Sequence, residues 1–175
     1  MNAGKVMLVV LAGLGLCASI GCGGRCPCGC GRGAPLDDNK AVIRRQVDEV
    51  WNKGNLAALD EIMAADLIGH GMPPGMPPTR DGFKQLIGGH RKAFPDLVVT
   101  IEDMLAEGDT VANRWTWTGT HKGDYLGVAP TGKKVTLRGI SIHRLENGKI
   151  AEQWHQTSML DLMQQFGVVK PPPGK

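Results

Sequence analysis

Three polar side chains near the C-terminal end of the chain, His155, His143 and Ser141, are the candidates for catalysis. A histidine with an ordinary pKa of ~6.5 can take up and return a proton at neutral pH, and a hydroxyl group can donate a hydrogen bond. Such a set can remove a proton from a carbon next to a carbonyl group and stabilise the resulting oxyanion without a cofactor. In the competing interpretation, His155 only bonds a neighbouring strand and His143 is a solvent-exposed strand end.

A second group of polar and aromatic residues is predicted to bind substrate, namely His70, His121, Trp115, Trp117 and Gln153. Trp115 and Trp117 share one face of a predicted strand, where two aromatic rings either fill the core or form a wall for a flat ligand. The histidines show no HxH or HExxH spacing, so we predict neither a metal site nor a cofactor. His90 stands beside Arg91 and Lys92, a charged setting that is typical of a solvated helix face.

The ENG turn at residues 146–148 decides on which face of the sheet His155 lies. We favour a three-residue loop, which groups His155 with Ser141 and Gln153 on one polar face. The alternative is a two-residue Asn-Gly turn. It would move His155 to the opposite, apolar face with Ile142, because a slip of one residue exchanges the two faces of a strand.

The elements that must position these residues are helices followed by strands. Apolar spacing predicts a helix between Asn39 and Gly54, a short helix over 56–63 and a third helix over 80–94. The period then changes to two, which predicts antiparallel strands over 97–105, 110–120, 134–145 and 150–157. A short helix over 159–166 follows, capped by Ser158 and closed by Gly167. The order predicts an α+β domain, with about three N-terminal helices packed on a curved antiparallel sheet.

The first 21 residues predict a signal peptide, because Lys5 precedes an apolar run that is too short to span a bilayer at the usual ~20 residues. Cys22 follows Ser-Ile-Gly, which is an imperfect lipobox. We expect export across the inner membrane and acylation of Cys22. The protein would then be held in the cell envelope by a lipid anchor alone.

The folded part is predicted to be one domain at 38–169, between a Gly/Cys-rich tether at 22–37 and a disordered tail at 170–175. All five cysteines precede the domain, so it is expected to contain neither a thiol nucleophile nor a disulfide. The one-residue spacing of the last three cysteines is not that of a structural zinc site. The formal charge is only +3, which argues against nucleic acid as a partner.

The chain resembles the SnoaL-like polyketide cyclases in several short segments, namely GTH, APTGK, ENGKIAEQW, EGDTVANRW and MLDLMQQFG. These proteins, also called ester cyclases, belong to the nuclear transport factor two-like superfamily. The resemblance covers about 38–169. It implies a cone-shaped fold and a homodimer that forms through the outer face of the sheet.

The resemblance also implies roles for individual residues. In that family an aspartate of the last strand acts as the acid/base for an intramolecular aldol ring closure, and His155 stands at its position. A pocket histidine of the family falls at Ser141, so His143 is a candidate replacement for it, and His70 is expected at the mouth of the cavity.

The function that we expect is cofactor-free aldol cyclisation of a small hydrophobic, polyketide-like molecule. Two alternatives stay open. One is a non-catalytic module that binds a small ligand or only dimerises, because this fold also serves as a scaffold. The other is an isomerase, dehydratase or hydrolase that uses the same pocket.

Overall fold

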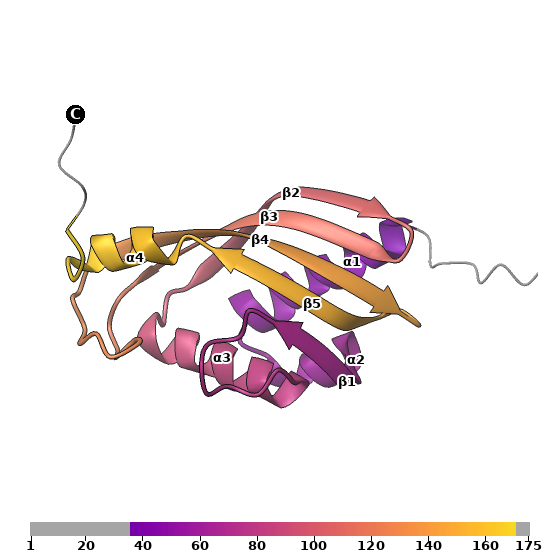
Figure 1. Cartoon of the computed structure of the whole chain (residues 1–175), viewed down its shortest axis with the longest axis horizontal. Helices are drawn as coiled ribbons and strands as arrows, with labels where there is room; N and C mark the ends of the chain where they lie inside the picture. Colours follow the sequence, from indigo (N-terminus) through magenta and orange to yellow (C-terminus); the bar gives the residue numbers. More distant parts are fainter. Residues whose placement is uncertain (1–35, 171–175) are drawn as a thin grey trace, which may run out of the picture. The chain divides into compact units, whose positions relative to one another are not determined.

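The computed structural model of the protein describes residues 36–170. Its elements are α1 (Leu36–Arg45), a π-helical segment (Gln46–Asn52), a 3-10 turn (Leu56–Ala58), α2 (Leu59–Ile62), β1 (Met63–His70), α3 (Arg80–Ala93), β2 (Val98–Glu107), β3 (Thr110–Thr120), β4 (Lys134–Glu146), β5 (Lys149–Thr157) and α4 (Met159–Phe166). Five strands of this part form one sheet in the order β1-β5-β4-β3-β2, and α1 and α3 lie on one side of it (Figure 1). The predicted α+β architecture is confirmed.

The signal peptide, the Cys22 lipidation site and most of the tether are predictions that lie outside the described residues, as does nearly all of the C-terminal tail. Within residues 36–170, no helix is both long and apolar enough to cross a membrane.

The first helix runs from α1 through the π-helical segment and ends at Asn52. Ile43 and Val50 are fully buried on the face that meets the sheet. The helix begins before Asn39, where it was predicted to start, and Asn39 lies inside its first turn. Asn39 is buried, and its Nδ2 donates to the carbonyl oxygen of Gly108 at 3.2 Å. This partner is distant in the sequence, so local patterns could not reveal it.

The segment Met63–His70 is a strand, whereas we predicted a short helix up to residue 63 and no strand before residue 97. It pairs in parallel with β5, so the sheet is mixed and not wholly antiparallel. Two consecutive alanines favour a helix by propensity, but burial of Met63 and Leu67 decides the outcome. A register shift before Ile68 also removes the strict alternation by which strands are recognised.

The hairpin between β4 and β5 closes with a two-residue turn. Asn147 and Gly148 have φ angles of 52° and 74°, and positive φ at both positions is the type I′ geometry that Asn-Gly favours. Glu146 therefore pairs with Lys149, and the predicted three-residue loop is wrong.

A shift in register beyond the turn restores the predicted faces. Leu145 pairs with Ile150 but Arg144 pairs with Glu152, so Ala151 is an extra residue in β5. This bulge moves the rest of β5 by one residue. The polar side chains of both strands consequently lie on one face, as predicted, although the turn differs from the prediction.

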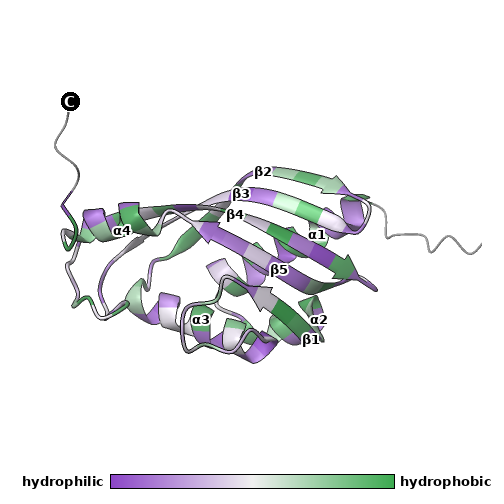
Figure 2. Cartoon of the chain, in the orientation of Figure 1, coloured by the Kyte–Doolittle hydropathy of each residue, from purple (hydrophilic) through white to green (hydrophobic). Residues whose placement is uncertain are grey.

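The core lies between the sheet and the helices. Figure 2 shows hydrophobic residues on α2 and β1. One buried cluster includes Leu59 of α2 and Phe83 of α3. A second cluster surrounds Phe94, Trp117 and Phe166. Each of these side chains contributes about 1.5–3 kcal/mol to stability by its removal from water.

Helix α4 has the predicted bounds. It ends at Gly167, whose φ of 90° is the left-handed conformation that a glycine adopts most easily. Ser158 precedes the helix as predicted, but among the described residues its side chain receives no capping hydrogen bond.

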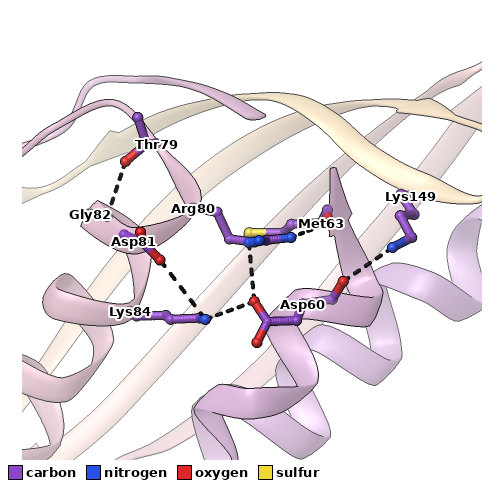
Figure 3. A network of polar contacts seen from close by, with 8 residues as sticks. All are labelled: Asp60, Met63, Thr79, Arg80, Asp81, Gly82, Lys84 and Lys149. Carbon is purple, nitrogen blue, oxygen red and sulfur yellow. Dashed lines mark hydrogen bonds and ion pairs between the residues drawn. The ribbon is translucent and has the colours of Figure 1, made fainter. Parts of the chain in front are cut away.

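A cluster of charges around Asp60 joins α2 and α3 to the hairpin (Figure 3). The Asp60 carboxylate forms ion pairs with Lys84 at 2.7 Å and Arg80 at 3.2 Å. Lys149 donates to the Asp60 carbonyl oxygen at 3.1 Å, and Arg80 donates to that of Met63 at 3.5 Å. The hydrogen bond from Lys84 is the main cause that lowers the pKa of Asp60. These contacts fix the start of α3, which forms one wall of the site.

Candidate active site

A cavity of about 520 Å³ lies between the sheet and the helices. The wall from the helices includes Ile43, Gln46, Trp51, Leu86 and His90, and the wall from the sheet includes Asn113, Trp115, Trp117, Ser141, His143, Gln153 and His155. Its size is within the range of sites for drug-sized ligands. Most of its lining is apolar, and five of its polar side chains lie on the sheet: Asn113, Ser141, His143, Gln153 and His155.

The polar groups of the sheet form a continuous chain of hydrogen bonds. Trp115 Nε1 donates to Ser141 Oγ at 2.8 Å, and Ser141 Oγ lies 2.8 Å from His155 Nδ1. The Gln153 amide nitrogen bonds the other ring nitrogen of His155, Nε2. Gln46 Nε2 in turn donates to Gln153 Oε1 at 3.5 Å. Both nitrogens of His155 are therefore held by residues that line the cavity.

This chain specifies where the protons lie. Because the Gln153 amide donates to Nε2, the neutral ring of His155 carries its proton on Nδ1 and gives it to Ser141 Oγ. The Ser141 oxygen also accepts from Trp115, so both of its lone pairs are occupied. The hydroxyl proton of Ser141 is then left for a group in the cavity.

Glycine at position 139 explains why Trp115 reaches Ser141. The two residues Trp115 and Gly139 are paired neighbours on β3 and β4. A Cβ atom on Gly139 would collide with the Trp115 ring. The missing side chain lets the indole lie across β4 toward Ser141, two residues further along the same face.

His155 is a neutral base at physiological pH. Burial lowers its pKa from 6.5 to about 4. Its ring lies 5.3 Å from the ring of Phe83, between centroids, so one side of it is apolar. Gly71 packs closely against the backbone of His155, since a Cβ atom on Gly71 would lie 2.8 Å from the His155 carbonyl oxygen.

His143 lies next to His155 and cannot donate into the cavity in its neutral form. It is only 2% exposed, which rules out a solvent-exposed strand end. Its Nε2 donates to Asn113 Oδ1 at 2.9 Å, and Nδ1 has no hydrogen-bond partner within the described part of the chain. Burial, followed by repulsion from His155, lowers its pKa to about 3. The Nδ1 lone pair of His143 is therefore a buried acceptor without a partner in this part of the chain.

The structure brings six of the predicted site residues to the cavity. Their positions are shared by three neighbouring strands, and they are Trp115, Trp117, Ser141, His143, Gln153 and His155. Trp117 is 2% exposed and packs in the core, whereas Trp115 takes part in the polar chain.

The other two predicted residues, His70 and His121, do not line the cavity. His70 stacks on Trp154 with centroids 4.9 Å apart and bonds Glu152 at 2.9 Å. His121 is fully buried and stacks on Phe166 with centroids 4.3 Å apart.

His90 and Tyr125 are among the cavity residues that were missed. His90, predicted to lie on a solvated helix face, is 7% exposed and bonds Tyr125, and both line the cavity. The signal for His90 was its spacing, since it follows the buried Phe83 and Ile87 by seven and three residues on α3. Tyr125 lies in a loop, where no periodicity marks it.

No group of three His, Cys, Asp or Glu side chains within residues 36–170 is placed to hold a metal ion.

Comparisons with known proteins agree with this fold. The family model of the SnoaL-like polyketide cyclases matches residues 41–166. AclR from Streptomyces galilaeus, a candidate hydroxylase, is 31% identical with a TM-score of 0.70, over 79% of this chain and 87% of its own. IdmH from Streptomyces antibioticus, a candidate polyketide cyclase, is 31% identical with a TM-score of 0.66, over 74% and 98%.

A candidate polyketide cyclase from Bacillus cereus is 30% identical, with a TM-score of 0.67 over 75% of this chain and 82% of its own. No curated protein matches the chain. The family match covers most of the described residues and includes every residue of the polar chain. The protein therefore belongs to the SnoaL-like polyketide cyclase family.

Proposed function

We propose that the cavity binds a small hydrophobic carbonyl compound and catalyses proton transfer on it without a cofactor, as in an intramolecular aldol ring closure. The observation that carries this proposal is the Ser141–His155 pair in a largely apolar cavity. One member of the pair is a neutral base, and the other has a hydroxyl proton free for an oxyanion.

The proposed reaction uses each group once. The substrate C–H replaces the Gln153 amide as the partner of His155 Nε2, which takes the proton from the carbon next to the carbonyl group. The electron pair of the broken C–H bond forms an enolate, whose oxygen accepts the Ser141 hydroxyl proton as a hydrogen bond. The enolate carbon then attacks a second carbonyl carbon of the same molecule. The new alkoxide takes the proton back from His155, which returns to its neutral form.

The change from aspartate to histidine alters the charges during this reaction. An aspartate base becomes neutral when it takes a proton, whereas neutral His155 becomes a cation beside the enolate. Attraction between the imidazolium and the enolate is strong in an apolar cavity. This ion pair offsets the weak basicity of a histidine whose pKa is about 4.

A non-catalytic binding module is the second candidate. It is favoured by the fact that both nitrogens of His155 already have partners within the protein. In that case the polar chain would only orient a bound ligand, and the protein would not change it.

Deuterium exchange of a simple ketone tests the proposal. The protein is expected to exchange the α-protons of 2-tetralone for deuterium in heavy water faster than buffer alone, because enolate formation is the first step. Proton NMR measures the rate. Saturable binding of 2-tetralone without faster exchange would support the binding module instead.

We also propose that the protein is a homodimer that forms through the outer face of the sheet. Ile140 and Ile142 on that face are 53% and 41% exposed, and Ile142 pairs with Trp154. An apolar patch of this kind marks an interaction surface on many proteins.

Replacement of Ile142 by glutamate is expected to convert the dimer to a monomer, because a charge would be buried without a partner. Analytical ultracentrifugation at micromolar concentration measures the change. Leu160→Glu is the matched control, since Leu160 is an exposed residue of α4 and not of the outer face of the sheet. A monomeric wild-type protein would refute the proposal.

A further inference from the structure

A second polar site lies on the helix side of the cavity, away from the Ser141–His155 pair. His90 Nδ1 is 2.8 Å from the carbonyl oxygen of Leu86, and His90 Nε2 is 2.8 Å from the Tyr125 hydroxyl. Both His90 and Tyr125 line the cavity and are buried. The proposed function does not use either residue.

The direction of these hydrogen bonds is fixed by chemistry. A carbonyl oxygen can only accept, so His90 carries its proton on Nδ1 and donates it to Leu86. Burial lowers the pKa of His90, which keeps the ring neutral and leaves Nε2 as an acceptor. The Tyr125 hydroxyl proton is therefore committed to His90. The Tyr125 oxygen has no donor among residues 36–170, and it presents only lone pairs.

The surrounding rings hold this arrangement in place. Trp51 and Trp117 meet the His90 ring edge-on, with centroids 5.5 and 6.1 Å away. Phe94 contacts the Tyr125 ring in the same manner at 5.1 Å. Burial raises the pKa of Tyr125 to about 12, so its hydroxyl stays protonated.

The turn that carries Tyr125 is strained in a way that suggests function. Tyr125 and Val128 exchange both backbone hydrogen bonds, and the two residues between them have φ angles of 51° at Leu126 and 79° at Gly127. Leucine rarely adopts a positive φ, and such strain is found mainly at functional sites. Leu126 itself lines the cavity while 55% of its surface is exposed.

This turn is anchored to the helix that carries His90. The backbone nitrogens of Lys122 and Gly123 both donate to the carbonyl oxygen of Ala93, at 2.8 and 3.1 Å. A Cβ atom on Gly123 would lie 2.7 Å from the carbonyl oxygen of Lys92, so only glycine permits this approach. Two unusual backbone positions, at Gly123 and Leu126, therefore hold Tyr125 in place.

We propose that Tyr125, held by His90, is a binding site for a hydroxyl group of the ligand, such as a phenol or an enol. The inference rests on the proposed function only in that the same cavity binds the ligand. The two polar sites are complementary: Ser141 offers a proton to a carbonyl oxygen, and Tyr125 offers a lone pair to a hydroxyl. The substrate class is then a hydroxylated carbonyl compound that presents the two groups to opposite walls.

Binding of two matched compounds tests this proposal without any turnover. The probes are 2-tetralol and 2-tetralone, which share a ring system and differ in having a hydroxyl or a carbonyl group. Isothermal titration calorimetry measures the affinity of each. Tyr125→Phe is expected to lower the affinity for 2-tetralol about tenfold, the typical effect of one buried hydrogen bond, and to leave the affinity for 2-tetralone unchanged.

A second variant reverses the polarity of the site. His90→Phe frees the Tyr125 hydroxyl to donate, so the affinity for 2-tetralone is expected to rise. His70→Phe makes the same change outside the cavity and should alter neither affinity.

The proposal is overturned if Tyr125→Phe lowers the affinity for both compounds equally or for neither. It is also overturned if 2-tetralol shows no saturable binding to the wild-type protein. These outcomes are independent of His155. Failure of the ketone exchange with intact Tyr125-dependent binding would remove only the catalytic proposal, and the reverse result would remove only this one.

Discussion

Acidification from pH 7 to pH 4.5 is expected to lower the free energy of unfolding by about 4–5 kcal/mol. Burial holds the pKa of His155 at about 4 and that of His143 at about 3, against 6.5 in the unfolded chain. Below pH 6.5 the unfolded state therefore binds protons that the folded state does not. Stability is fully present above pH 6.5 and is lost as the pH falls toward 4. The loss is a large part of the ~5–15 kcal/mol that stabilises a typical domain.

Urea unfolding at a series of pH values measures this loss. His143→Gln is expected to reduce the dependence on pH, because one of the buried groups no longer titrates, whereas His155 and His90, whose pKa values burial also lowers, still do. The variant also loses the bond to Asn113, so the slope against pH is the informative quantity and not the stability at one pH. A wild-type stability that is flat between pH 7 and pH 4.5 would contradict the buried, neutral state of both histidines.

Replacement of His155 by alanine is expected to slow the catalysed exchange of 2-tetralone by a factor of about 10²–10⁴, the usual effect of the loss of one general base. Affinity for the ketone should change little, because the apolar walls and the Ser141 hydroxyl remain. His155→Asp should retain more activity than His155→Ala, since a carboxylate can perform the same transfer.

The matched control is Gln156→Ala, the next residue of β5, which is exposed on the opposite face of the sheet. It should exchange at the wild-type rate. If His155→Ala instead exchanged as fast as the wild type, His155 would be a structural residue that only completes the polar chain.

Much of the fold could be predicted because its signals are local. The change from helical spacing to alternation at residue 97 marks the boundary between α3 and β2, and Gly167 marks the end of α4. β1 could not be predicted, because its pairing with β5 depends on an edge that exists only in the folded sheet. The same limit applies to Asn39, whose partner is distant in the sequence.

Ser141 and His155 were expected on the same face of the sheet, but the three-residue loop on which that expectation rested is not present. The turn has one residue fewer than predicted, which alone would have sent His155 to the apolar face. The bulge at Ala151 compensates for this difference. No pattern in the sequence reveals the bulge, because an alanine is tolerated on either face of a strand.

The candidate site was predicted in part. The sheet side carries alternating polar residues, and these were found. The helix side was missed, since His90 was judged by its charged neighbours and not by its spacing from Phe83 and Ile87. Burial of His90 follows from the helical period alone.

The exchange rate of 2-tetralone at pH 5.5, compared with that at pH 7.5, tests most directly the central claim that His155 acts as a neutral base. With a pKa of about 4, His155 stays neutral at both pH values, so the part of the rate that depends on His155 should be nearly equal. The stability loss at pH 5.5 is incomplete, so the protein remains folded for the measurement. A histidine with its ordinary pKa of ~6.5 would be mostly protonated at pH 5.5, and the rate would fall roughly tenfold. Such a fall, or the absence of any His155-dependent exchange at either pH, would contradict the account.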